Sequence, residues 1–123
     1  MRLVIIASVV FGVAACGGDP TPKEACNDVA VALCERLYAC FTAQELAAAQ
    51  YPSSESGCVT QLETQEGCAA KTTANACDGN EKYHGNYADS CTDQVSGLEC
   101  SQVRDPNFNA DTAAPACDKV CSI

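Results

Sequence analysis

Cysteine constrains this chain more than any other residue, because 11 cysteines occur within only 123 residues. A chain of this length buries a limited core, and small exported domains commonly compensate with disulfides. Zinc sites, iron–sulfur sites and thiol–disulfide catalysts typically use cysteine pairs separated by two residues. The sequence contains no such pair, and its most closely spaced cysteines are Cys117 and Cys121. We therefore expect disulfides, with metal ligation and redox catalysis as the alternatives.

The N-terminal residues have the pattern of an export signal. Arg2 is followed by an apolar run over residues 3–13, which is too short to form a stable membrane-spanning helix. The segment Val13-Ala14-Ala15-Cys16 resembles a bacterial lipobox. This resemblance implies cleavage between Ala15 and Cys16 and a diacylglycerol on the Cys16 sulfur. The alternative is an ordinary signal peptide, cleaved after Ala15, that leaves a free Cys16 thiol.

The odd number of cysteines favours the lipidated form of Cys16. An unpaired cysteine in an exported protein needs an explanation, and a lipid on Cys16 leaves an even set of ten. Two or three acyl chains also anchor a protein far more firmly than one. We expect a lipoprotein signal peptide at residues 1–15, a lipidated N-terminus with a short tether at 16–21, and a disulfide-rich helical domain at 22–123. Gly17 stands where an aspartate would resemble an inner-membrane retention signal, so we expect the outer membrane, on its periplasmic or surface face.

Two capping boxes predict where the first helices begin. Thr21-Pro22-Lys23-Glu24 offers an N-cap threonine, a proline at the first helical position and a glutamate at the third. Apolar residues then recur at helical spacing as far as Phe41. Thr42-Ala43-Gln44-Glu45 predicts a second, short helix to about Gln50, which Tyr51-Pro52 ends.

The remaining sequence predicts two more helices and almost no strand. Ser53 or Ser54 caps a third helix over roughly residues 54–69, and a turn-rich loop follows at 70–80. A fourth helical stretch covers about 87–103, although Gly97 weakens its middle. Pro115 opens a final turn. Because no segment alternates apolar and polar residues as strands do, we expect an all-α fold, a small three- to four-helix bundle cross-linked by about five disulfides.

Helix geometry limits how the cysteines can pair. Cys91 and Cys100 would lie about 13 Å apart along one helix, whereas bridged cysteines need Cα atoms within about 7 Å. The same argument excludes Cys26–Cys34 and Cys58–Cys68 if their helices are continuous. An antiparallel first and third helix would bring Cys40 near Cys58, and either Cys26 or Cys34 near Cys68; the other pairings stay open. The ten cysteines assigned to disulfides are Cys26, Cys34, Cys40, Cys58, Cys68, Cys77, Cys91, Cys100, Cys117 and Cys121.

No group of residues indicates catalysis or metal binding. His84 is the only histidine, lies in a segment of turn composition and has no Gly-x-Ser-x-Gly motif to accompany it, so we expect an exposed loop residue. Asp78-Gly79-Asn80-Glu81 predicts a tight turn, because its glycine stands second rather than sixth as in a calcium loop. We expect no catalytic residue, no metal and no cofactor. The carboxylates expected on solvated helix faces are those of Glu63, Glu66, Asp89 and Asp93.

The net charge of −9 argues against a nucleic-acid-binding protein, which needs clustered basic residues. A family resemblance rests on the lipobox and on four cysteine-containing segments, Ala32–Cys40, Gly57-Cys58-Val59, Leu98-Glu99-Cys100 and Pro115-Ala116-Cys117. With these segments the chain resembles the cysteine-rich helical lipoproteins of myxobacterial-type genomes. The resemblance implies location and architecture but no activity. We expect a non-enzymatic structural or protein-interaction module of the bacterial envelope, with its lipid in the membrane and an unknown protein partner. The alternative is a carrier with a small molecule or lipid in an apolar cavity between helices, and an enzyme is the third possibility.

Overall fold

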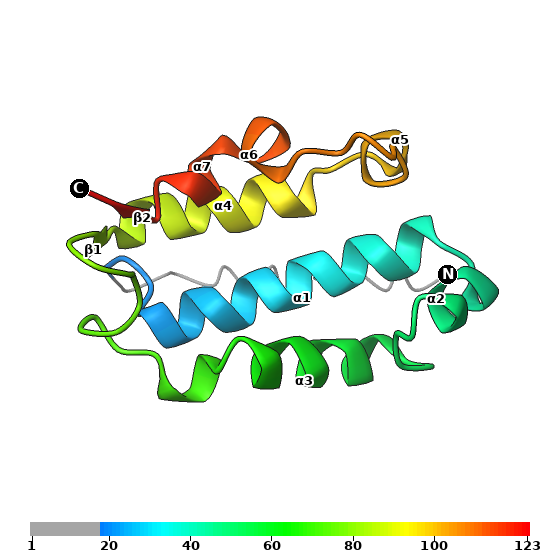
Figure 1. The fold of residues 1–123 in the computed structure, drawn as a ribbon, viewed down its shortest axis with the longest axis horizontal. Helices are drawn as coiled ribbons and strands as arrows, with labels where there is room; N and C mark the ends of the chain where they lie inside the picture. Colours follow the sequence, from blue (N-terminus) through cyan, green and yellow to red (C-terminus); the bar gives the residue numbers. More distant parts are fainter. Residues whose placement is uncertain (1–17) are drawn as a thin grey trace, which may run out of the picture.

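Three helices form the body of the domain in the computed structural model, which describes residues 18–123. Helix α1 (Pro22–Cys40) lies between α3 (Glu55–Gln65) and α4 (Gly85–Ser96), as Figure 1 shows. Helices α3 and α4 each pack on α1 rather than on one another. The fold is therefore a small disulfide-rich helical one, as the sequence predicts, with α1 as its central element.

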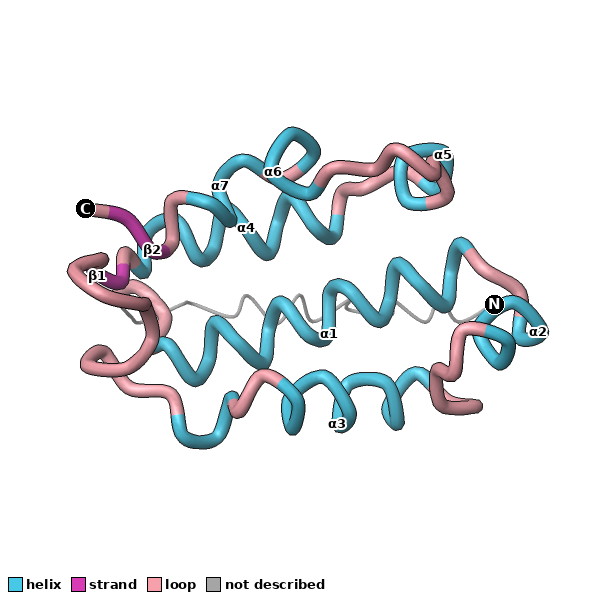
Figure 2. Tube along the Cα trace, in the orientation of Figure 1, coloured by secondary structure: helices cyan, strands magenta, loops and turns pink. Residues whose placement is uncertain are grey.

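Short elements complete the fold at both ends of these helices. Figure 2 shows a two-stranded antiparallel sheet, and the loop that leads into it after η1, at the end of the molecule where α1 begins. In this sheet Lys82 lies opposite Ser122, and Tyr83 lies opposite Cys121. The short elements are α2 (Ala43–Ala48), the 3-10 helix η1 (Cys68–Ala70), β1 (Lys82–Tyr83), α5 (Cys100–Val103), α6 (Ala110–Ala113), α7 (Pro115–Asp118) and β2 (Cys121–Ser122).

Both predicted capping boxes are present. At the start of α1, the Thr21 hydroxyl oxygen accepts the Glu24 N–H at 3.3 Å, and the Glu24 carboxylate accepts the Thr21 N–H at 2.8 Å. Thr42 and Glu45 make the same pair of bonds at the start of α2. These bonds satisfy backbone donors that a helix N-terminus otherwise leaves unpaired.

Two predicted helices are shorter than expected, and a glycine lies at each break. The third helix ends at Gln65 because Gly67 adopts a left-handed conformation, with φ of 64°, which places Cys68 on η1 instead. The predicted helix over 87–103 begins two residues earlier and ends at Ser96, where Gly97 is its C-cap. Helix α5 then starts separately, because Glu99 and Gln102 form a capping box of their own.

The five disulfides use all ten cysteines of the described residues, and each joins two different elements. Three of them leave α1, and they reach η1, α3 and α5. The other two connect the 71–81 loop to β2 and α4 to α7. The bridges are Cys26–Cys68, Cys34–Cys58, Cys40–Cys100, Cys77–Cys121 and Cys91–Cys117.

The expected proximity of Cys40 and Cys58 is wrong, whereas Cys26 is indeed one of the two expected neighbours of Cys68. Helices α1 and α3 are antiparallel, but α2 and the segment after it occupy the region beyond the end of α1. Helix α3 therefore starts further back along α1, where Cys58 meets Cys34. Cys40, the last residue of α1, is left to pair with Cys100.

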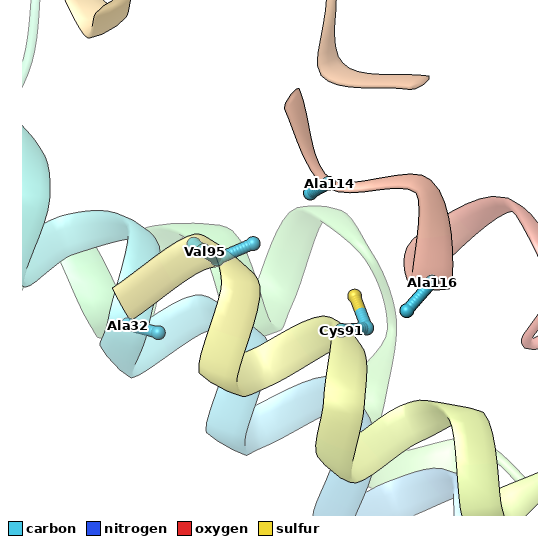
Figure 3. Close-up of a cluster of buried hydrophobic side chains, with 5 residues drawn as sticks. All are labelled: Ala32, Cys91, Val95, Ala114 and Ala116. Atoms are coloured by element: carbon cyan, nitrogen blue, oxygen red, sulfur yellow. The ribbon is translucent and has the colours of Figure 1, made fainter. Parts of the chain in front are cut away.

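The buried core is built from small side chains. Its main cluster lies where α1, α4 and α7 meet, and it consists of Ala32, Cys91, Val95, Ala114 and Ala116 (Figure 3). The largest fully buried side chains of residues 18–123 are the half-cystines Cys34, Cys58 and Cys68. Because large apolar side chains contribute so little buried area, the disulfides supply much of what holds this fold together.

Candidate binding cleft

A cleft of about 390 Å³ runs along one open face of α1, and we call it the α1 cleft. Its floor is the N-terminal half of α1, from Pro22 to Leu33. Leu62 of α3 and Glu66, the C-cap of this helix, form one wall, and residues of α4, α7 and the 120–121 segment form the other. The cleft exists because α3 and α4 flank α1 without closing over it.

Most side chains that line the α1 cleft are apolar. Val29, Leu33 and Val120 contribute aliphatic surface, and only Glu66 and Lys71 contribute charged groups. The two have opposite charge, and the ion pair found within residues 18–123 involves neither of them. An apolar concavity of this volume with few polar groups has the character of a small-molecule site.

Disulfides brace three sides of the α1 cleft, and half-cystines form part of its lining. Cys26–Cys68 joins the floor to the region where α3 ends, and Cys91–Cys117 joins α4 to α7. Cys77–Cys121 joins the 71–81 loop to the last strand. These covalent links fix segments that line the cleft relative to one another.

The tether before α1 is fixed at one end of the α1 cleft. The Tyr83 hydroxyl donates a hydrogen bond to the Pro20 carbonyl at 2.6 Å, and Tyr83 and Pro22 both line the cleft. Gly85 permits this approach, because a Cβ added there would lie 2.5 Å from the Asp19 Cβ. The chain therefore reaches the domain beside the cleft rather than on the opposite side.

Acidic groups surround this same end of the molecule. Partial burial, together with the negative charges of Asp89 and Glu24, raises the pKa of Asp28. Burial, with Asp89 foremost among the nearby carboxylates, likewise raises the pKa of Tyr83. The Tyr83 phenol therefore stays protonated at neutral pH and serves as a hydrogen-bond donor rather than as a base.

The structure tests some of the predicted site residues and does not describe others. Ala15 and Cys16, predicted for signal cleavage and lipidation, lie outside the described residues. All ten cysteines from Cys26 onward are in disulfides. The carboxylates of Glu66, Asp89 and Asp93 are exposed as expected, whereas Glu63 is half-buried. The Asp78–Glu81 segment forms the expected turn, in which Gly79 has a φ of 58° and the Glu81 N–H donates to the Asp78 carbonyl.

His84 is half-buried, and the expectation of an exposed loop residue is wrong. Its backbone N–H donates to the Val120 carbonyl at 2.8 Å, and its ring meets the Tyr87 ring edge-on, with the centroids 6.2 Å apart. The pairing of β1 with β2 draws this position inward, next to the start of α4.

The α1 cleft itself is a feature that sequence reasoning missed. No local signal was available, because Ala25, Val29 and Leu33 mark a single apolar stripe of α1. Such a stripe predicts packing against neighbouring helices rather than a cleft. Lys71 and Tyr83, by contrast, come from turn-rich segments with no periodic pattern. Only the disulfides and the short sheet bring them to the cleft.

Five disulfides indicate that the protein folds in an oxidising, exported environment. Among the helices of residues 18–123, none combines the length and apolar composition that crossing a membrane requires. The same residues contain no cluster of three or more histidine, cysteine or acidic side chains able to hold a metal ion. No family model, curated protein or solved structure matches this chain.

Proposed function

We propose that this protein is a lipid-anchored, non-enzymatic module of the bacterial envelope, in which a disulfide-braced helical domain is held close to the membrane. One observation carries the proposal: the disulfides use every cysteine from Cys26 onward, so Cys16 alone has no cysteine left to pair with within the chain. Cys16 ends a lipobox-like segment, and lipidation accounts for both facts.

The anchor is tested by replacing Cys16 with alanine and fractionating the cells that export the protein. We expect the unsubstituted protein in the outer-membrane fraction and the Cys16→Ala variant outside the membrane or retained as uncleaved precursor. A Ser8→Ala variant, altered in the same apolar run but not at the acceptor, is the matched control and keeps the original distribution. Equal membrane association of Cys16→Ala and the unsubstituted protein, with processed forms whose masses differ only by the exchanged side chain, would contradict the anchor.

Within this role, the acidic surface favours a partner with a basic patch. The net charge of −9 speeds association with positively charged surfaces and disfavours contact with anionic polymers. The interaction is tested by chemical crosslinking in intact cells at low and high salt. We expect a defined crosslinked partner at low salt and its loss at high salt, because added ions screen exposed charges. A crosslinking pattern with no defined product at either salt concentration would contradict the interaction role.

The α1 cleft favours a second function, that of a carrier for an apolar small molecule. It is concave and mostly apolar, and three disulfides cross-link segments of its lining. Covalent restraint of this kind lowers the cost of ordering the lining when a ligand binds. Mass spectrometry of organic extracts from the purified native protein tests this function. We expect one class of apolar compound in stoichiometric amount, and an extract free of such compounds would contradict it.

A further inference from the structure

We propose that the α1 cleft binds a single-chain zwitterionic amphiphile of the lysophospholipid type, with the hydrocarbon chain over α1 and the head group between Lys71 and Glu66. The proposal rests on the carrier function given above for this cleft and names its ligand class. Three features of the cleft carry it: its size, the charges at its rim and its position beside the tether.

The size of the α1 cleft favours one hydrocarbon chain. Ligand pockets cover roughly 300–1,000 Å³, and the 390 Å³ of this cleft lies near the lower end. The floor is a strip of α1 from Pro22 to Leu33, which suits an extended chain rather than a broad ring system. Two chains of a bilayer phospholipid would need a wider space between α3, which Cys34–Cys58 links to α1, and α4, which packs on α1.

The charged residues of the lining complement a zwitterion. Lys71 is half-buried, Glu66 is exposed, and both line the cleft without an ion pair between them. A phosphate beside the Lys71 ammonium and an ammonium group beside the Glu66 carboxylate would satisfy both charges. The carboxylate of a fatty acid would pair with Lys71 but would be repelled by Glu66. An uncharged ligand would form an ion pair with neither residue.

The tether indicates that the ligand comes from the membrane. Pro20 is bonded to Tyr83 at one end of the cleft, and Cys16 precedes Pro20 by four residues. Four residues span at most about 14 Å even when fully extended. A lipid on Cys16 therefore holds this end of the α1 cleft near the bilayer surface, where single-chain amphiphiles partition.

Photocrosslinking of the full-length exported protein in its own membranes tests the proposal. The probe is lysophosphatidylethanolamine with a diazirine in its acyl chain, and the crosslinked peptides are mapped by mass spectrometry. A diazirine fatty acid and a diazirine monoacylglycerol serve as anionic and uncharged comparators. We expect the zwitterionic probe to label the peptides that contain Leu33 and Leu62 more strongly than either comparator does.

Two matched pairs of variants examine the chain and the head group separately. Ala76→Trp fills the cleft from the 71–81 loop, and Ala74→Trp is its control, because Ala74 is exposed and does not line the cleft. We expect Ala76→Trp to lower cleft labelling by roughly tenfold or more, since excluding two or three methylenes of the ligand has that effect on affinity.

The second pair tests the head group. Lys71→Gln should lower labelling by the zwitterionic probe roughly tenfold. Lys82→Gln changes an exposed residue outside the cleft and should leave the labelling unchanged. Alkylation without reduction confirms that each variant has formed its disulfides.

The outcomes separate this proposal from those it rests on. Equal labelling by the uncharged probe keeps the carrier function and overturns the zwitterionic ligand. A cleft labelled by none of the three probes, or labelled equally in Ala76→Trp, overturns ligand and carrier together. The N-terminal peptide from the same samples reports on Cys16. Cleft labelling in a protein whose Cys16 carries no lipid supports the ligand while removing the anchor.

Discussion

Cys34 and Cys58 are fully buried, and their sulfurs occupy core volume that leucine or isoleucine fills in larger domains. Replacing both by alanine removes a cross-link and also leaves a cavity, so we expect a loss of about 3 kcal/mol or more in the free energy of unfolding. Urea unfolding followed by circular dichroism measures it. The double alanine variant of Cys77 and Cys121 is the comparison, because this pair is half-buried.

The two variants also distinguish chain entropy from packing. Loop entropy alone makes the Cys77–Cys121 bridge, with a sequence separation of 44, slightly more stabilising than Cys34–Cys58, with a separation of 24. Because the Cys34–Cys58 sulfurs are buried, we expect the opposite order, with the larger loss of unfolding free energy in the Cys34 and Cys58 variant. A smaller loss for the Cys34 and Cys58 variant than for the Cys77 and Cys121 variant would show that packing of these sulfurs contributes little.

Glu45 and Arg104 form a salt bridge at the opposite end of α1 from the cleft. Their side chains lie 2.6 Å apart, and Arg104 also donates to the Cys40 carbonyl at 2.7 Å. Hydrogen bonds from Arg104 and from the Thr42 backbone lower the pKa of Glu45 from 4.5 to about 2. Since the folded state holds this carboxyl ionised more strongly than the unfolded chain does, the contribution to stability is present above pH 4.5 and is lost as the pH falls through about 2.

We expect Glu45→Gln to be less stable than the unsubstituted protein at pH 6, with the difference shrinking between pH 4.5 and pH 2. Because both side chains are partly exposed, the difference should also shrink in high salt. Urea unfolding across this pH range measures both effects. Glu81→Gln is the control, since the Glu81 side chain makes no hydrogen bond within residues 18–123. A pH-independent difference between Glu45→Gln and the unsubstituted protein contradicts the assignment.

At the scale of the element, the start of α1 depends on one threonine. The Thr21 side chain caps the Glu24 N–H, and the same residue belongs to the tether beside the α1 cleft. Thr21→Ala should lower the free energy of unfolding by about 1 kcal/mol, the usual value for loss of an N-cap. Chemical denaturation measures this loss, and Thr73→Ala, in an exposed turn, should change stability by less than half as much. Equal effects of the two substitutions would argue that the capping bonds contribute nothing.

The elements that sequence reasoning predicted well are those specified by local chemistry. Thr21 and Thr42 begin helices because their side chains and a glutamate three residues later satisfy the helix N-terminus. The breaks at Gly67 and Gly97 were less predictable, because glycine lowers helix propensity without dictating where a helix ends. The Cys40–Cys100 pairing was not predictable from the sequence, since it depends on where α5 starts after the break at Gly97. The α1 cleft arises from the relative placement of three helices, which no local pattern encodes.

At the scale of the whole molecule, a core of small residues and five disulfides go together with the anchor that we propose at one end. The disulfides compensate for the small apolar area of a core built mainly of alanine and half-cystine, and three of them cross-link segments that line the α1 cleft. The tether lies against Tyr83 and Gly85, so a lipid on Cys16 fixes both the distance of the domain from the membrane and the position of the cleft.

The central claim is that Cys16 carries lipid while the other ten cysteines form five disulfides. The most direct test is the intact mass of the protein extracted from membranes and alkylated without prior reduction. We predict the mass of the chain from Cys16 to Ile123 plus a diacylglycerol, with or without a further acyl group, and no alkylated thiol. Several alkylated thiols, or a Cys16 without lipid, would contradict the account.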